Sequence, residues 1–276
     1  MIETRHTSTI DATLAAAAFG NQPQSWPLPT ATTPRQLWLR AVASGGQGRY
    51  GSAFRDLAAL RRSGAGGPLV SLAHSTQGSF LRQLGWHERA RGWDGRALAL
   101  AGTDPEAQAD ALIGLAADAL GVGRFAAAAA LLTRADSTLA AATVPDRLAV
   151  RRRWVGAELA MASGEGDVAV RRAEEAVELA GAMGSGRLEA SARHRVKSDV
   201  VLAAALCSAG RADRAREVAE AALDATERFG LIPLRWALAC LLIDIGSVTF
   251  SARELPEIRD VCAGQVRRAG GAWRSA

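Results

Sequence analysis

The chain has 276 residues, of which 49% are hydrophobic and 22% are charged, so it is long enough to bury a core and is not of disordered composition. Alanine occurs 60 times, whereas aromatic residues make up only 5%. Because alanine is the best helix former and strands favour β-branched and aromatic side chains, this composition predicts an all-α fold and argues against all-β and α/β folds.

The formal net charge of +5 is distributed unevenly along the chain. Residues 1–100 carry 11 arginines and 5 acidic residues, a net of +6, and the remaining 176 residues carry 22 basic and 23 acidic groups, a net of −1. Arginine supplies 32 of the 33 basic residues, a bias that a GC-rich genome would also produce. A nucleic-acid surface usually shows a denser basic stripe, so the total charge is weak evidence for such a partner.

The three cysteines and the lack of long apolar runs predict a cytoplasmic protein. Cys207, Cys240 and Cys262 lie far apart without a C-x-x-C pair, so we expect them to be reduced, buried and inert. The apolar run 14–19 is too short for the apolar region of a signal peptide, and it follows Asp11. No stretch reaches the roughly 18 apolar residues of a membrane helix, so no membrane association is predicted.

Residues 1–33 form the first predicted unit. Asp11 is expected to cap a short helix that ends at Phe19, and residues 21–34 hold four of the nine prolines, which predicts an extended tether. One interpretation is a partly disordered tail. The other is a segment that packs on the body, and even occupies its groove through residues 8–28, because large apolar side chains are costly to leave in water. The side chains concerned are Ile10, Leu14, Phe19 and Trp26.

Residues 34–276 form the second predicted unit, in which alanine- and leucine-rich runs alternate with short glycine-rich breaks. Glycine ends helices because it adopts the left-handed conformation without strain, and proline is favoured in the first helical turn. These signals predict about twelve helices arranged as antiparallel hairpins. The prolines expected at helix starts are Pro68, Pro105, Pro145 and Pro233, and the expected N-caps are Asp104, Asp146 and Asp167.

A repeated pair of small residues, twelve positions apart, links the two helices of each predicted hairpin. Helices that cross at 8–10 Å need small side chains at the contact, which explains the pairing. The pairs are Ala41 and Ala53, Gly78 and Ala90, Ala116 and Ala128, Ala157 and Ala169, Ala203 and Ala215, and Ala239 and Ser251. A glycine follows each first member by seven residues, at Gly48, Gly85, Gly123, Gly164, Gly210 and Gly246.

Residues 34–250 resemble the tetratricopeptide repeat. The third hairpin carries its pattern best, with Leu112, Leu115, Ala116, Ala119, Gly123, Phe125, Ala128, Leu132 and Ala135. The resemblance implies a right-handed α-solenoid of about six antiparallel helical hairpins, with a concave groove lined by the first helices. The spacing departs from the family's 34 residues, since the second-helix small residues are 36 to 46 apart. Pro256 interrupts the last unit, so we expect a final capping helix that begins near Leu255.

Motifs for chemistry are weak along the whole chain. The segment His87-Glu88-Arg89 lacks the second histidine that a zinc-binding helix needs four residues later, so a charged turn at a helix start is expected. Residues 64–67 are glycine-rich but follow no predicted strand, which favours a linker over a phosphate-binding loop. Lys197, the single lysine, has no neighbour that would activate it. We therefore predict no catalytic residues, no metal and no cofactor.

The predicted function is a non-catalytic scaffold or regulatory module that binds a protein or peptide in the groove, and the arginines there favour an acidic one. Arginine binds carboxylates bidentately, and arginine and aromatic residues dominate interface energetics. The predicted groove residues are Arg35, Trp38, Arg82, Arg151, Trp154, Glu158, Lys197 and Trp236. Three alternatives stay open: the tryptophans pack between repeats, the arginine clusters are ion-paired solvated faces, or those clusters bind nucleic acid. The clusters are Arg147 with Arg151, Arg152 and Arg153, then Arg171 with Arg172, then Arg193 with Arg195 and Lys197. The acidic residues expected to pair with them are Asp146, Glu158, Glu174, Glu175 and Glu189. The oligomeric state is left open between a monomer and a homodimer.

Overall fold

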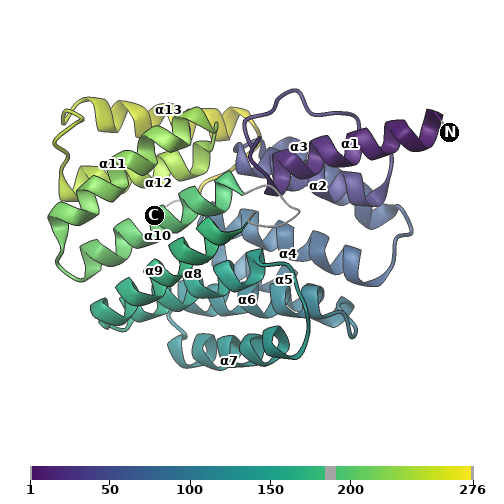
Figure 1. Cartoon of the computed structure of the whole chain (residues 1–276), viewed down its shortest axis with the longest axis horizontal. Helices are drawn as coiled ribbons and strands as arrows, with labels where there is room; N and C mark the ends of the chain where they lie inside the picture. Colours follow the sequence, from purple (N-terminus) through teal and green to yellow (C-terminus); the bar gives the residue numbers. More distant parts are fainter. Residues whose placement is uncertain (1, 184–190, 275–276) are drawn as a thin grey trace.

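The computed structural model describes residues 2–274 apart from 184–190, and side chains from residue 9 onward (Figure 1). Those residues form thirteen α-helices and no strand, which confirms the predicted all-α class. The helices are α1 (Ile2–Phe19), α2 (Pro34–Gly46), α3 (Tyr50–Arg62), α4 (Gly67–Gln83), α5 (His87–Leu100), α6 (Pro105–Gly121), α7 (Phe125–Ala141), α8 (Arg147–Ala162), α9 (Gly166–Ala182), α10 (Ala192–Ser208), α11 (Ala212–Arg228), α12 (Ile232–Ile245) and α13 (Glu254–Arg268).

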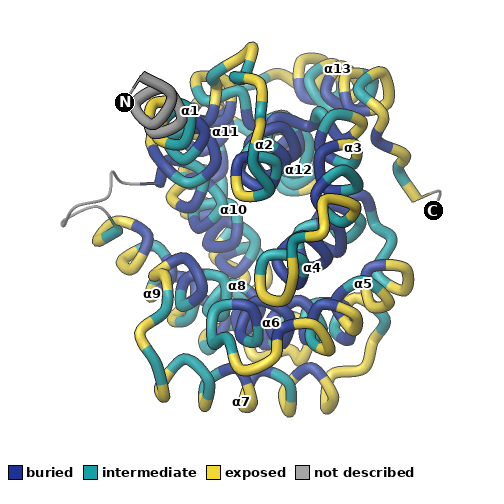
Figure 2. The backbone as a smooth tube through the Cα atoms, turned by 90° about the vertical axis from the view of Figure 1, so that its right-hand side faces the viewer, coloured by how far each residue is buried: buried dark blue, intermediate teal, exposed yellow. Residues whose placement is uncertain are grey.

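Consecutive helices pack against each other along the whole chain, as expected for a helical repeat. Contacts also join every second helix, from α2 through α4, α6, α8 and α10 to α12. Figure 2 shows that these first helices lie around the middle of a ring, with the second helices outside them. We call the face that the first helices turn toward the middle the inner surface.

Small residues lie at most of the predicted helix contacts. In the first five pairs the alanines are fully buried, including Ala41 and Ala53. Gly78, the glycine of the second pair, is needed for a different reason than close backbone packing. A Cβ at this position would overlap the carboxylate of Asp94. The sixth pair was wrong, since Ser251 is exposed and lies in the loop before α13. The final helix does begin at the predicted place, at Glu254.

The turn and cap signals are mostly confirmed. The five repeat glycines from Gly48 to Gly210 have positive φ angles of 74–88°, which only glycine adopts at little cost. Asp104 caps α6 by accepting from the amide of Ala107 at 2.8 Å. The other two predicted caps were wrong: Asp146 precedes α8 without a side-chain cap bond, and Asp167 pairs with Arg211 instead.

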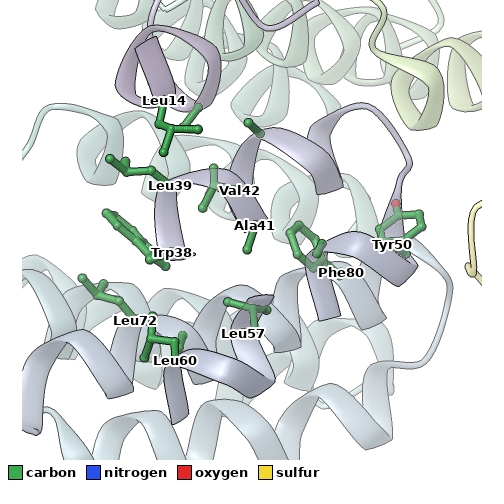
Figure 3. Packing of buried hydrophobic residues seen from close by; sticks show 14 of the residues in the cluster. Leu14, Trp38, Leu39, Ala41, Val42, Tyr50, Leu57, Leu60, Leu72 and Phe80 are labelled. Atoms are coloured by element: carbon green, nitrogen blue, oxygen red, sulfur yellow. The ribbon is translucent and has the colours of Figure 1, made fainter. Parts of the chain in front are cut away.

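The N-terminal segment is more helical than its sequence predicted, and it packs on the body. Its helix begins at Ile2 rather than near Asp11, so only residues 20–33 are non-helical. Leu14 is fully buried beside Leu39 and Val42 of α2 (Figure 3). Of the two interpretations of this segment, the packed one therefore describes residues 9–33.

The side chain of Gln47, directly after α2, and a backbone amide of α10 hold residues 20–33 in place. Gln47 donates to the carbonyls of Pro23 and Ser25 at 2.8 and 2.9 Å. The amide of Ala192 donates to the carbonyl of Gly20 at 3.1 Å. This linker thus connects the end of α2 to the start of α10.

Residues 269–274, which we call the closing tail, join the last helix to the first hairpins. The amide of Gly51 donates to the carbonyl of Ala269 at 2.7 Å, and Trp86 Nε1 donates to the carbonyl of Ala272 at the same distance. Trp273 stacks on Trp236 of α12 with ring centroids 4.2 Å apart. The last helices of the chain are therefore fastened directly to the first hairpins, which closes the ring of Figure 2.

Candidate partner-binding site

The first polar centre of the inner surface is built around Arg82, near the end of α4. Its guanidinium donates to Asp94 of α5 and, at 2.9 Å, to Asp118 of α6. Both carboxylates are fully buried. Burial raises the pKa of Asp94 to about 7, because Arg82 offsets the loss of hydration only in part and Asp118 adds repulsion. Arg82 is thus committed to holding three helices together.

A second centre joins α6 to α8. Arg147 pairs with Glu106 and, at 3.4 Å, with Asp110, and Arg151 pairs with the same Asp110. Burial and the neighbouring Arg82 together lower the pKa of Arg151 to about 10. Two buried guanidinium groups therefore share one aspartate on this part of the inner surface.

The contact between α8 and α10 carries part-exposed polar groups on the inner surface. Trp154 Nε1 donates to Ser198 Oγ at 2.9 Å, and the Trp154 ring stacks on His194 with centroids 5.4 Å apart. Lys197 Nζ lies 3.5 Å from Glu158, and their side chains are 30% and 34% exposed. These part-exposed groups can contact a partner without first breaking a buried network.

Phe19 and Arg193 bring the N-terminal segment, α2, α8 and α10 together. The Phe19 ring lies 5.3 Å from Trp38, and the Arg147 guanidinium lies 5.2 Å from the Phe19 ring centre. Arg193 Nη1 donates to the carbonyl of Val42 at 3.1 Å. An aromatic side chain of the N-terminal segment thus packs against side chains of α2 and α8.

The eight predicted groove residues do not form one site. Arg35 is exposed in the first turn of α2, whereas Trp38 is buried and donates to Thr76 of α4 at 3.0 Å. Trp236 is stacked under Trp273 of the closing tail. Arg82 is held between two aspartates, as described above. The remaining four lie together, and we call them the α8–α10 patch: Arg151, Trp154, Glu158 and Lys197.

Two outward arginines of the predicted clusters are paired with carboxylates, and a third bonds a backbone carbonyl. Arg152 contacts Asp136 at 2.5 Å, and Arg153 contacts Glu175 at 2.6 Å. Arg172 donates to the carbonyl of Gly156 at 2.9 Å. These contacts agree with the ion-paired interpretation of the clusters. One predicted partner, Glu189, lies outside the described residues.

Some groups of the inner surface had no usable signal in the sequence. Asp94 is the central carboxylate of the Arg82 site, but it sits on a second helix and belonged to no predicted motif. Phe19 was expected either in a partly disordered tail or in a packed segment, without a named contact. Arg193 had been placed in an arginine cluster, but its bond to a helix 151 residues away has no local pattern.

Two adjoining cavities, each of about 460 Å³, lie at the ring closure rather than on the inner surface. One is bounded by the N-terminal linker and α13, where Arg49 lies 3.8 Å from the ring centre of the 45% exposed Trp26. The other lies between α12 and α13, and Ile232 and Gln265 line both. Their volumes fall in the range of small-ligand sites, and the sequence did not predict them.

The three cysteines are all unbonded, but only Cys262 is buried, whereas Cys207 and Cys240 are half-buried. Burial raises the pKa of the Cys240 and Cys262 thiols, which keeps them protonated. Within residues 2–183 and 191–274, no group of three histidine, cysteine or acidic side chains gathers as metal ligands would. In the same part of the chain, no helix combines the length and apolar character needed to cross a membrane.

Comparison with known proteins gives no family for this chain. No protein-family model matches it, and no curated protein matches it significantly.

Proposed function

We propose that this protein is a cytoplasmic, non-catalytic binding module with a tetratricopeptide-like architecture, in which six hairpins form a right-handed superhelix. The alternation of inner and outer helices and the positive-φ turn glycines support this architecture. Its partner is an acidic peptide or an acidic protein segment that binds along the first helices.

The α8–α10 patch is the observation that carries the proposal. It combines an arginine, a tryptophan and the single lysine on two adjacent first helices, and Lys197 and Glu158 keep about a third of their side chains exposed. Tryptophan and arginine are the residue types most enriched at binding hot spots, and Lys197 can exchange Glu158 for a carboxylate of a partner. The carboxylate pairs of the outer arginines disfavour the alternative of nucleic-acid binding.

Lys197 and Glu158 carry opposite charges, so replacing each of them should change the affinity for an acidic peptide in opposite directions. The probe is a fluorescent twelve-residue peptide of alternating Asp and Glu, with an Asn/Gln peptide of the same length as its control. Lys197→Gln should weaken binding of the acidic peptide about two- to fivefold, as expected for a part-exposed charge. Glu158→Gln should strengthen it by a similar factor, because it removes a like charge. Fluorescence anisotropy at fixed salt measures both.

Arg195→Gln is the matched control, because Arg195 is exposed on the same helix as Lys197. It should leave the affinity nearly unchanged. Equal weakening by Arg195→Gln and Lys197→Gln would mean that only net charge matters, and it would overturn the patch. Tighter binding of a DNA or RNA oligonucleotide than of the peptide, with a steep salt dependence, would favour the nucleic-acid alternative.

A further inference from the structure

Arg193 differs from the other arginines of the inner surface because it has no carboxylate partner among the described residues. Arg82, Arg147 and Arg151 each contact at least one aspartate. The single hydrogen bond of Arg193 within that part of the chain runs from Nη1 to the backbone carbonyl of Val42. A guanidinium group has five N–H donors, so most of the donors of Arg193 have no protein acceptor there.

Arg193 lies close to other guanidinium groups. Burial and the nearby Arg147 together lower its pKa to about 10. Arg193 in turn lowers the pKa of Arg151. Arg147 and Arg151 are paired with Asp110 and the part-exposed Glu106, so Arg193 is the one of these three guanidinium groups without a carboxylate among the described residues. Burying a cation without a counter-charge is costly, and a bound anion would offset that cost.

The position of Arg193 gives an anion a defined place to bind. Its side chain packs against Gly46, where a Cβ would come within 3.2 Å of Nη1, and it retains part of its accessible surface. The adjacent His194 adds no charge, because burial and the surrounding arginines hold its pKa well below its ordinary value. The Tyr50 hydroxyl, which donates to Gln83 Oε1 at 2.8 Å, is also close enough for Arg193 to influence its pKa.

We propose that Arg193, flanked by Arg147 and Arg151, is the anchor of a binding site for a small oxyanion, of the phosphate or carboxylate type, inside the ring. A guanidinium group binds either oxyanion bidentately. The site shares Arg151 with the α8–α10 patch, but its anchor is Arg193 and the oxyanion does not require Trp154, Glu158 or Lys197, so different variants test the two proposals. A free anion and the terminal group of a larger ligand use the same chemistry here.

Thermal unfolding of the full chain, at constant ionic strength, tests the site. The probes are sodium phosphate and sodium succinate at 10 mM, each compared with sodium chloride. Phosphate should raise the Tm of the native chain by roughly 2–4 °C, because a ligand that binds only the folded state stabilises it. Arg193→Gln should lose most of this shift, and it should unfold in chloride no earlier than the native chain, since it removes an unneutralised charge.

Arg195→Gln is the matched control, because it makes the same charge change two residues away on the exposed side of α10. It should keep the full phosphate shift. A larger shift with succinate would still support the oxyanion site and would identify a carboxylate as its ligand. Equal shifts in all three chains would overturn the proposal, because they would report a general salt effect. If Arg193→Gln does not fold, calorimetric titration of the native chain with phosphate tests the site instead. Binding of phosphate below 10 mM supports the site, and absence of binding at 10 mM overturns it.

Discussion

Helices are joined by different kinds of contact on the inner surface and at the ring closure. On the inner surface, buried ion pairs such as Arg82 with Asp118 join first helices that are neighbours in the repeat. At the closure, backbone carbonyls and aromatic rings of two non-helical segments do the joining, as in the stack of Trp273 on Trp236. The repeated sequence pattern therefore determines contacts between neighbouring hairpins. The ring is closed by segments that lie outside the repeat.

The largest expected effect comes from the Arg82 site. Arg82→Ala leaves Asp94 and Asp118 buried beside each other without their cation, so the free energy of unfolding should fall by about 3–5 kcal/mol. Urea unfolding followed by circular dichroism measures it. The control is Asp167→Ala, which removes an exposed pair with Arg211 and should cost less than about 1 kcal/mol. Similar losses for both variants would contradict a special role for the buried pairs.

An intermediate effect is expected at the closure. Trp273→Ala removes a half-buried ring and its stack on Trp236, so the free energy of unfolding should fall by about 2 kcal/mol. Hydrogen exchange of the Gly51 amide, which donates to Ala269, should accelerate more than exchange within α6. Leu100→Ala, at a site 40% exposed on α5, is the control. Uniform acceleration along the chain would show that the closure is not a local unit.

The third expected effect is a pH dependence that only the inner surface should show. The pKa of Asp94 is raised from 3.8 to about 7, so the folded state binds more protons than the unfolded state between those values. The free energy of unfolding should therefore fall as the pH rises from about 4 to about 7. Asp94→Asn should flatten this dependence, as measured by urea unfolding at several pH values. An unchanged slope would assign the titration to other groups.

The repeat pattern predicted most of the helical body because its signals are local. Alanine pairs such as Ala41 and Ala53, together with turn glycines such as Gly48, mark each hairpin independently of the rest of the chain. The prediction of the final pair failed because the last helix begins at Glu254, close to Pro256. Ser251 therefore lies in the preceding loop and not on a helix. The sequence predicts a helix α1 that is too short, because it indicates Asp11 as the N-cap. Asp11 lies inside the helix, which begins at Ile2.

The candidate site was less predictable, because helix faces specify orientation but not partners. The pattern placed Trp154 and Lys197 on one surface, where they lie within a short distance of each other. It could not tell that Trp236 would be covered by Trp273, since that contact depends on the path of the closing tail. Likewise, Arg193 lacks a carboxylate partner among the described residues because the nearby carboxylates pair with Arg147 and Arg151. The spacing of residues along the sequence does not predict which arginine stays unpaired.

The closing tail also bears on self-association. In an open helical-repeat protein, each terminal unit presents a stacking face that must be made polar, or further copies can add to it. Here the amide of Gly51 and the indole of Trp86 are already engaged by the carbonyls of Ala269 and Ala272. Among the described residues, the two ends of the array therefore cover part of each other's stacking face.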